Sequence, residues 1–509
     1  MSFFDFSMLG NAIRIIQQGA KAANRSDEDF ISHEITRTRL SNEWNWMMIG
    51  DDYYRGRHEI LHKERTVIGK DGKPETVDNL PNAKLIDNVY RRMVKQKVNY
   101  LLGKPFSISS DKEQYTDALT WFFDKRFFMQ LKRVGTDALN CGIGWLYPYY
   151  NEQGQFCFKR FRPYEIIPEW SDVDHTHLES FIRFYDVRFY NGKYDETLTK
   201  VEYYTKNGID FYEYFNGKLV PADPYHQNYF TVNGVEYNWD RIPLIAFKYN
   251  DEELPLIIHC KSLQDALNQI LSTFDDAMNE DVRNTILVLV NYDGENLAEF
   301  RKNLATYGAV KVRSADGANG DVRTLQIEVN SDNYKAICEI LKKAIIENCL
   351  GYDAKDEKSS GTPNEMNIMS MYNDVDLDAS DMETEFQAAL DDLLYFVDLH
   401  LLNTGQGDFM DVDATITFNT NMPMDEASTI TNAQNSVGLI SKKTILAHHP
   451  WVTDVDAELD QLEDERQEAA AQELDGYDPF GNLKKTHGDN DPDADDDSVK
   501  GGEDEKHNR

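Results

Sequence analysis

Residues 331–350, SDNYKAICEILKKAIIENCL, are followed by Gly351 and by the polar segment YDAKDEKSSGTPN at 352–364. Apolar side chains recur in the first stretch at three- and four-residue intervals, which predicts an amphipathic helix that packs lengthwise against a partner. They are Tyr334, Ile337, Cys338, Leu341 and Ile345. Gly351 is predicted to end the helix. The next segment has almost nothing to bury and several turn formers, so we predict a mobile loop between two helices.

Long helices are predicted on both sides of this stretch. The helix after the loop runs to about Leu402, and its apolar face consists of Met382, Phe386, Leu390, Leu393 and Val397. Upstream, residues 256–284 form another predicted helix, whose apolar stripe consists of Leu263, Leu267, Ile270, Leu271, Phe274 and Met278. The polar residues placed outside that stripe are Gln264, Asp265, Asn268, Asp276 and Glu280.

A small α+β insertion is predicted between the helices, at residues 285–330. Its predicted parts are a strand at 285–291, a helix at 295–307, and strands at 309–313 and 322–329 around a glycine-rich loop at 314–321. Because one helix leads into the insertion and another leads out, its two ends must lie close together.

The N-terminal half changes from a helical pattern to a strand pattern. Residues 27–103 are predicted to be mainly helical, with Ser26 or Asp27 as the N-cap and an exposed hairpin or loop at 69–74. From Trp145 to Tyr249, short aromatic and β-branched runs predict an antiparallel meander with one face packed. Its type I′ turns are predicted at Asn191-Gly192, Asn207-Gly208, Asn216-Gly217 and Asn233-Gly234.

The C-terminal part is predicted to contain a strand at 414–418 and helices at 425–437 and 454–474. The second helix is very acidic. Beyond Gly476 the apolar pattern ends, and residues 488–497 are rich in aspartate. This composition predicts a disordered tail.

The charge balance limits the possible functions. The 509 residues carry 53 basic and 89 acidic side chains, a formal charge of −36. Such a surface repels phosphates, so tight sequence-specific DNA binding is disfavoured. The length predicts about three domains.

Cysteine usage and hydropathy give further limits. The five cysteines are scattered without a CxxC spacing, which argues against a zinc site or disulfide framework and favours a reducing cytoplasm. The longest apolar run, residues 286–290, is far shorter than a membrane helix requires. The N-terminus lacks the features of a secretory signal, so we expect no membrane partner.

Three possible sites receive simpler interpretations. Gly142-x-Gly144 lacks the third glycine of a dinucleotide loop and precedes a strand, so we interpret it as a turn. Asp374, Asp376, Asp378 and Glu385 have the spacing of a calcium loop, but Ala379 replaces its glycine and the segment has a helical pattern. His448-His449 lacks an HExxH context, and no P-loop or nucleophile elbow occurs. We therefore predict no catalytic, metal or cofactor residues.

Six segments, in order along about residues 50–465, resemble the portal proteins of tailed double-stranded DNA phages, in the branch common among long-tailed phages of Gram-positive bacteria. They are Tyr53 to Leu61 (YYxGxHxIL) with Pro81 to Asn88, Val98 to Pro105 (VxYLLGKP), Pro163 to Pro168 (PxEIIP) with Ile182-Arg183, Ser272 to Leu289, Ser360 to Asn364 (SGxPN), and Gly438 to Glu458. In one departure, the family's usual Ser-Gly-x-Ala is Ser-Gly-Thr-Pro here.

The resemblance implies an α+β portal-type subunit. Its expected regions are a helical and β-meander wing at 1–255, stem helices at 256–284 and 331–351, a clip at 285–330, a tunnel loop at 352–365, a long wing helix and return strand at 366–420, a helical crown at 421–475 and an acidic tail at 476–509. It also implies a ring of about 12 subunits at one capsid vertex of the virion, assembled in the host cytoplasm.

The expected partners are double-stranded DNA in transit, the terminase large subunit, a head-completion or adaptor protein, scaffold protein and major capsid protein. An acidic channel does not bind the DNA phosphates and therefore lets DNA slide. The few basic residues expected in the channel are for that reason of interest. The loop residues expected at the DNA are Asp353, Lys355, Asp356, Glu357, Lys358, Ser360 and Gly361, and those of the stem are Lys342 and Lys343. The alternatives are an acidic phage-head scaffold and a maturation enzyme, neither of which forms a channel.

Overall fold

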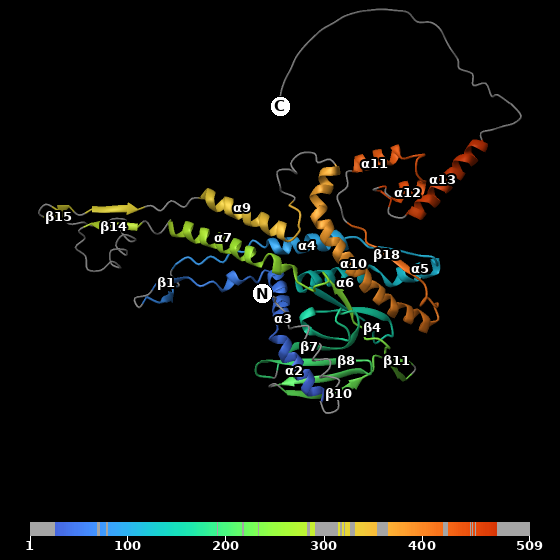
Figure 1. The fold of residues 1–509 in the computed structure, drawn as a ribbon, viewed down its shortest axis with the longest axis horizontal. Coiled ribbons are helices and arrows are strands. Elements are labelled where there is room, and N and C mark those ends of the chain that lie inside the picture. The colour runs from blue at the N-terminus through green and yellow to red at the C-terminus, as the bar shows by residue number, and fades with distance from the viewer. Residues whose placement is uncertain are drawn as a thin grey trace, which may run out of the picture. The chain divides into compact units, whose positions relative to one another are not determined.

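A computed structural model describes residues 26–475 of the chain. The ranges left out within it are 69–71, 78–79, 191, 216–217, 233, 282–285, 291–313, 316–317, 320, 326–330, 354–364, 421–425, 448, 450 and 453–454. The chain divides into two units, residues 1–423 and 424–509. The predicted α+β class is confirmed, because helices and antiparallel sheets share the first unit (Figure 1).

The first unit begins with helices that serine residues cap. Ser26 caps α2 (Asp27–Arg39) as predicted, and Ser41 caps α3 (Asn42–Arg55). A short 3₁₀ turn, η1 (Glu59–His62), and the hairpin β1 (Thr66–Ile68) to β2 (Pro74–Thr76) follow. The prediction of a mainly helical 27–103 is therefore wrong between 63 and 88, where the described backbone contains no helix.

Three helices follow in the region where the chain changes from helices to strands. They are α4 (Val89–Leu102), α5 (Glu113–Phe122) and α6 (Lys125–Cys141), with strand β3 (Ser107–Ser110) between the first two. Sequence reasoning assigned neither α5 nor α6. Gly142 ends α6 with a φ of 85°, and a Cβ atom there would lie 1.9 Å from the carbonyl oxygen of Glu253. The turn interpretation of this glycine is confirmed, because β4 begins directly after it.

The predicted β-meander is confirmed. Two sheets form, with strand orders β13-β4-β5 and β10-β9-β8-β7-β6, and β11 pairs with β12. The strands are β4 (Ile143–Tyr150), β5 (Phe156–Phe161), β6 (Ile166–Trp170), β7 (Leu178–Tyr190), β8 (Asp195–Thr205), β9 (Gly208–Phe215), β10 (Lys218–Gln227), β11 (Phe230–Val232), β12 (Val235–Tyr237) and β13 (Ile245–Lys248). Each Asn-Gly pair lies between neighbouring antiparallel strands, and the described glycines Gly192, Gly208 and Gly234 have the positive φ that such turns require.

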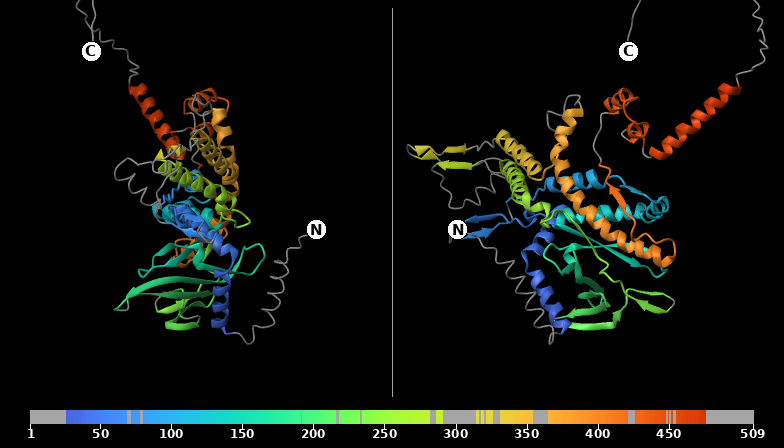
Figure 2. Two further views of the ribbon diagram at one scale, coloured as in Figure 1. Left: turned by 90° about the vertical axis from the view of Figure 1, so that its left-hand side faces the viewer. Right: turned by 45° about the vertical axis from the view of Figure 1, so that its right-hand side comes forward.

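Three long helices complete the first unit. They are α7 (Lys261–Asp281), α9 (Ser331–Asn348) and the 40-residue α10 (Glu365–Thr404). The 3₁₀ turn η2 (Pro163–Glu165) precedes β6, η3 (Leu256–His259) precedes α7, and β18 (Ala414–Thr417) pairs with β3. The views agree that α7 and α9 lie side by side (Figure 2).

The insertion between α7 and α9 begins and ends in one antiparallel pair. Strand β14 (Ile286–Val290) pairs with β17 (Asp321–Leu325), which confirms that its ends lie together. Where a loop was predicted at 314–321, the short strands β15 (Ser314–Ala315) and β16 (Ala318–Asn319) pair instead. The predicted helix at 295–307 and strand at 309–313 lie outside the described residues.

The main hydrophobic core of the first unit lies around α4, α6 and α10. Tyr90, Phe127, Phe247 and Phe386 are completely or almost completely buried in it. Smaller clusters pack α2 against the five-stranded sheet, with Ile31 and Ile182 at 0% exposure.

The second unit contains α11 (Glu426–Asn435), α12 (Lys442–Ala447) and α13 (Val455–Asp475). Two of these helices were predicted, and α12 was not. In this second unit, no side chain whose exposure the structure describes is buried. The predicted tail beyond residue 476 lies outside the described residues.

Candidate functional site

One buried lysine connects the segment before the predicted loop at 352–364 to the helix after it. Lys97 of α4 is 2% exposed, and its Nζ atom donates to the backbone oxygen of Leu350 at 3.2 Å and to Oδ2 of Asp378 at 2.6 Å. Leu350 follows α9 and Asp378 lies in α10. One cation therefore ties together the helix that precedes the loop and the helix that follows it.

Further contacts fix the start of the loop against α4. Gln96 accepts a hydrogen bond from the backbone N–H of Tyr352 and donates to its carbonyl oxygen. Gly351 packs so closely on α4 that a Cβ atom would lie 2.3 Å from the sulfur of Met93. The rings of Tyr352 and Tyr372 lie 4.6 Å apart, which adds a contact between the loop's start and α10. The loop thus has a rigid base.

The acidic spacing that resembles a calcium loop lies within α10, as the helical pattern predicted. Asp376 accepts from the hydroxyl of Tyr100, and Asp378 accepts from that of Tyr249 and from Lys97. Burial and these carboxylates raise the pKa of Tyr100 and of Tyr249. These aspartates therefore connect α10 to its neighbours.

A row of polar side chains on α7 is buried, which sequence reasoning missed. Gln264, Asn268, Ser272 and Asp276 follow one another at four-residue spacing and are at most 1% exposed. They form what we call the α7 polar ladder. Its partner is the backbone of residues 83–90, a non-helical segment up to residue 88 followed by the first two residues of α4.

Each step of the α7 polar ladder accepts a hydrogen bond from an alternate backbone N–H. Asp276 accepts from Ala83 at 2.6 Å and Ser272 from Leu85 at 2.9 Å. Asn268 accepts from Asp87 at 3.1 Å, and Gln264 from Val89 and Tyr90 at 3.1 and 3.2 Å. Four residues of a helix rise about 6 Å and two residues of extended chain about 6.6 Å, so the two periods match closely enough to pair.

Charged groups pair with the last step of the ladder, and a histidine contacts an inner step. The carboxylate of Asp276 is 1% exposed and lies 2.8 Å from Lys63 and 3.5 Å from Arg65. Asn268 donates to Nδ1 of His58, and Nε2 of His58 donates to the backbone oxygen of Tyr53. Burial lowers the pKa of His58, which favours this neutral form.

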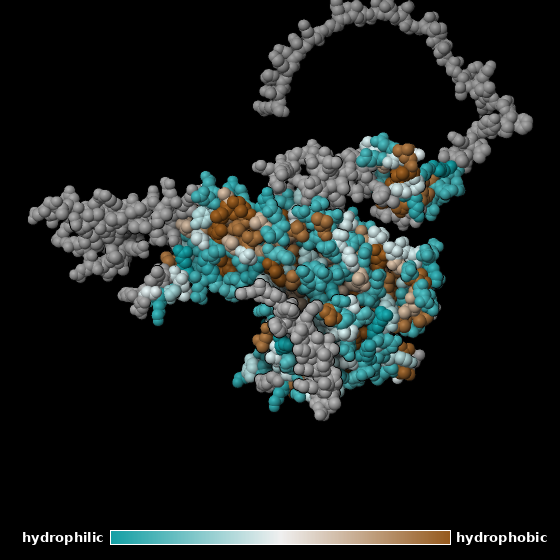
Figure 3. Space-filling model, in the orientation of Figure 1, coloured by the Kyte–Doolittle hydropathy of each residue, from teal (hydrophilic) through white to brown (hydrophobic). Residues whose placement is uncertain are grey.

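The two stem lysines have partners within the subunit. Nζ of Lys342 lies 2.7 Å from Asp87, and Nζ of Lys343 lies 3.8 Å from Glu347. Asp353 is described, whereas Lys355, Asp356, Glu357, Lys358, Ser360 and Gly361 lie outside the described residues. The apolar side chains Ile337 and Ile340 of α9 are 46% and 64% exposed. A hydrophobic patch lies on the surface over α9 (Figure 3).

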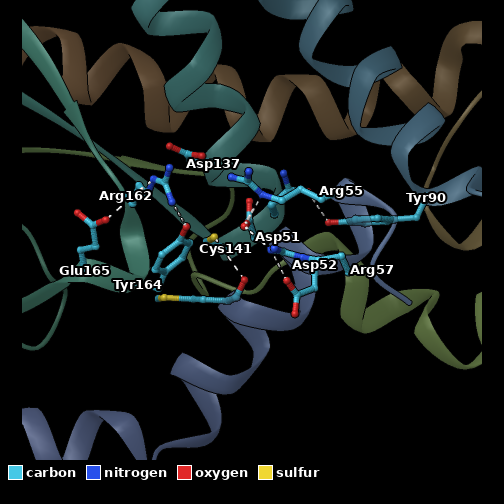
Figure 4. A network of polar contacts seen from close by, with 12 residues as sticks. Asp51, Asp52, Arg55, Arg57, Tyr90, Asp137, Cys141, Arg162, Tyr164 and Glu165 are labelled. Carbon is cyan, nitrogen blue, oxygen red and sulfur yellow. Dashed lines mark hydrogen bonds and ion pairs between the residues drawn. The ribbon is translucent and has the colours of Figure 1, made fainter. Parts of the chain in front are cut away.

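A separate group of polar contacts lies where α3, α6 and η2 meet, and the thiol of Cys141 in α6 donates to the backbone oxygen of Met47 in α3 (Figure 4). Arg55 donates to Asp51 at 2.6 Å, and Arg160 forms a two-pronged pair with Asp137. Burial raises the pKa of Asp137 to about 6, and Arg160 opposes that rise. Burial also raises the pKa of the nearby Cys141 thiol, which keeps it protonated and a poor nucleophile. We therefore interpret these contacts as stabilising the fold and not as a catalytic site.

Within the described part of the chain, no cluster of histidine, cysteine or carboxylate side chains has a metal-binding arrangement. His448 is not described, and His449 packs its ring against Trp451. No described helix is long and apolar enough to cross a bilayer. All five cysteines are free thiols.

Comparison with known proteins assigns the family. The sequence model of the family described as "Phage portal protein, SPP1 Gp6-like" matches residues 41–472. The chain belongs to this family. It is 28% identical to the portal protein of Bacillus phage SPP1 over 496 residues, covering 96% of this chain and 94% of that protein. It is also 28% identical to the portal protein of Clostridium phage phiCD119 over 444 residues, covering 84% and 94% of the two chains.

Membership in the portal family confirms the resemblance seen in the sequence. It gives the chain the role of a phage portal protein, the channel for DNA packaging in the capsid. The family is structural by name and implies an oligomeric ring in the virion, with capsid, terminase and DNA as partners.

Proposed function

We propose that about a dozen copies of this portal subunit close into a ring through a head-to-tail interface, with DNA passing through the central hole. The main support is the base of the 352–364 loop, where Lys97 fixes both flanking helices. A loop that contacts moving DNA needs such a rigid base. The exposed Ile337 and Ile340 of α9 give further support, because adjacent copies could cover them.

The proposed regions follow the order of the elements. Helices α7 and α9 form the stem, and the insertion at 285–330 forms the clip, which docks the terminase large subunit and later a head-completion or adaptor protein. The segment at 352–365 is the tunnel loop, the part up to residue 255 and the part at 366–420 form the wing, and residues 421–475 form the crown. Scaffold and major capsid protein contact the assembled ring during assembly in the host cytoplasm.

The tunnel loop is the proposed DNA contact. Ring closure would gather the copies of Lys355 and Lys358 at one level of an acidic channel, where they touch phosphates transiently and without sequence preference. Asp353, Asp356 and Glu357 beside them keep that contact weak. Lys342 and Lys343 have nearby carboxylates and contribute less.

We propose no catalytic role. Burial keeps the Cys141 thiol protonated, and the Asp137 carboxylate beside it pairs with Arg160. The competing function is an acidic head scaffold or maturation protein without a channel.

Particle mass and shape separate the two functions. We expect the purified chain to give the mass of a closed ring in light scattering and rings with a central hole in negative-stain images. Monomers or dimers alone at micromolar concentration, in both low and high salt, would rule out the portal ring.

A further inference from the structure

One face of α4 is basic in an otherwise acidic chain. Arg91, Arg92 and Lys95 are all exposed and lie within an arc of about 100° on the helix. Among the residues that the structure describes, none of the three forms an ion pair with a carboxylate within 4.0 Å. We call these three residues the α4 basic face.

The position of the α4 basic face is unfavourable for the helix itself. Arg91 and Arg92 lie in the first turn, after the N-cap Asn88, and no acidic residue occupies that turn. Cations near a helix N-terminus oppose the helix dipole, which favours anions there. Because these cations are unfavourable for the helix dipole, their presence indicates a contact outside the helix.

An acidic face with a matching spacing lies on α10. Asp374, Asp381 and Glu385 occupy one side of that helix, with Leu377 exposed beside them at 61%. Asp381 and Glu385 are four residues apart, as are Arg91 and Lys95, so each pair spans about 6 Å. In the described part of the chain these three carboxylates also lack an ion-pair partner.

The two faces do not meet within one subunit. Within one subunit, α4 contacts α10 through the pairs Lys97 with Asp378 and Tyr100 with Asp376, which lie on the side of α4 away from its basic face. On α10, Asp378 borders the exposed acidic face, which, among the described residues, has no ion pair with the α4 basic face of the same subunit. A ring needs two different, complementary surfaces on each copy. Strongly acidic copies also repel one another, so a local attraction is needed where they touch.

We infer that the α4 basic face of one copy docks on the α10 face of the next copy, formed by Asp374, Asp381 and Glu385. This inference rests on the ring of the proposed function and names the surfaces that close it. Exposed Leu377 contributes apolar contact in the middle of the interface. DNA phosphate is the alternative occupant of the basic face.

Charge reversal in the full-length chain tests the pairing. The basic-face variant carries Arg91→Glu, Arg92→Glu and Lys95→Glu, and the acidic-face variant carries Asp374→Lys, Asp381→Lys and Glu385→Lys. We expect each variant alone to need at least ten-fold more protein than wild type to form rings in sedimentation experiments. The control, Lys125→Glu with Arg126→Glu and Arg133→Glu on α6, has the same charge change as the basic-face variant and should assemble like wild type.

Mixing the two reversed variants gives the decisive measurement. In an equal mixture, alternating copies place each reversed face against its reversed partner, so rings should return, as they should when all six changes are in one chain. Variants that assemble normally would overturn the inference, and so would impaired variants that mixing fails to restore. Normal rings with weakened DNA retention in the basic-face variant would assign that face to DNA and also overturn the inference.

Two controls are needed to interpret the outcome. Circular dichroism and thermal melting establish that each variant folds, and neutral changes to Gln and Asn replace any reversal that does not. If wild type itself forms no ring, the proposed function fails. If wild type and both reversed variants all form rings, only the interface inference fails.

Discussion

The Nζ atom of Lys97 lies 2.6 Å from Oδ2 of Asp378, and these side chains are only 2% and 10% exposed. The pair joins α4 to α10 across 281 residues of sequence. Because Lys97 also donates to the oxygen of Leu350, the same cation holds the end of α9. One ionic contact therefore links the start of the predicted tunnel loop to the helix that follows the loop.

Replacing Lys97 by methionine keeps the length of the side chain and removes its charge. Lys97→Met leaves the Asp378 carboxylate buried without a cation, and breaking such a pair costs about 3–5 kcal/mol. We expect a fall of this size in the free energy of unfolding, measured with urea. Lys104→Met, just beyond the end of α4 and exposed, should leave stability unchanged. If Lys97→Met and Lys104→Met behave alike, the proposed role of Lys97 is wrong.

Asn268→Leu tests the α7 polar ladder. The change leaves the N–H of Asp87 and a ring nitrogen of His58 without partners in a buried place, which costs about 1–3 kcal/mol. The exposed neighbour Gln269→Leu is the matched control and should cost little. Chemical denaturation of both variants makes the comparison. Equal stabilities would mean that water replaces the ladder bond.

The titration of the Asp398 carboxyl should make the free energy of unfolding fall as the pH rises. Burial raises the pKa of its carboxyl to about 6 from 3.8, and the Tyr115 hydroxyl opposes that rise. Between these values the folded state holds the proton more tightly than the unfolded state, so raising the pH removes stability. The full shift corresponds to about 3 kcal/mol, most of which is lost between pH 4 and pH 7.

Asp398→Asn should remove that part of the pH dependence and raise stability at pH 7. Urea unfolding at pH 5 and pH 7, with wild type alongside, measures both effects. The exposed Asp408→Asn is the control and should follow wild type. An unchanged pH slope in Asp398→Asn would contradict the prediction.

Lys355→Ala with Lys358→Ala tests the tunnel loop. We expect ring assembly and procapsid incorporation to be normal, because the sequence of this polar segment has almost nothing to bury. The amount of DNA packaged or retained should fall, and added salt should have a smaller effect than on wild type because phosphate contacts are lost. Normal packaging with an unchanged salt response would remove the lysines from the mechanism.

The sequence by itself determined the local structure and the family. Asn-Gly pairs specify the meander because few residues other than glycine tolerate the positive φ of those turns, and apolar periodicity located α7, α9 and α10. The order of motifs identified the portal family. Such signals are local, or they are patterns along the chain, so they are visible without the fold.

Only the tertiary structure decided what the polar groups do. Asn268 and Gln264 have the spacing of an ordinary solvated helix face, and only the segment that leads into α4, together with the first turn of α4, makes them buried acceptors. The pairing of Lys97 with Asp378 could not be predicted either, because nothing in the sequence around a single helical lysine indicates a partner 281 residues away. Desolvation depends on the whole fold, and it turns these ordinary residues into the contacts that join α7 to residues 83–90 and α4 to α10.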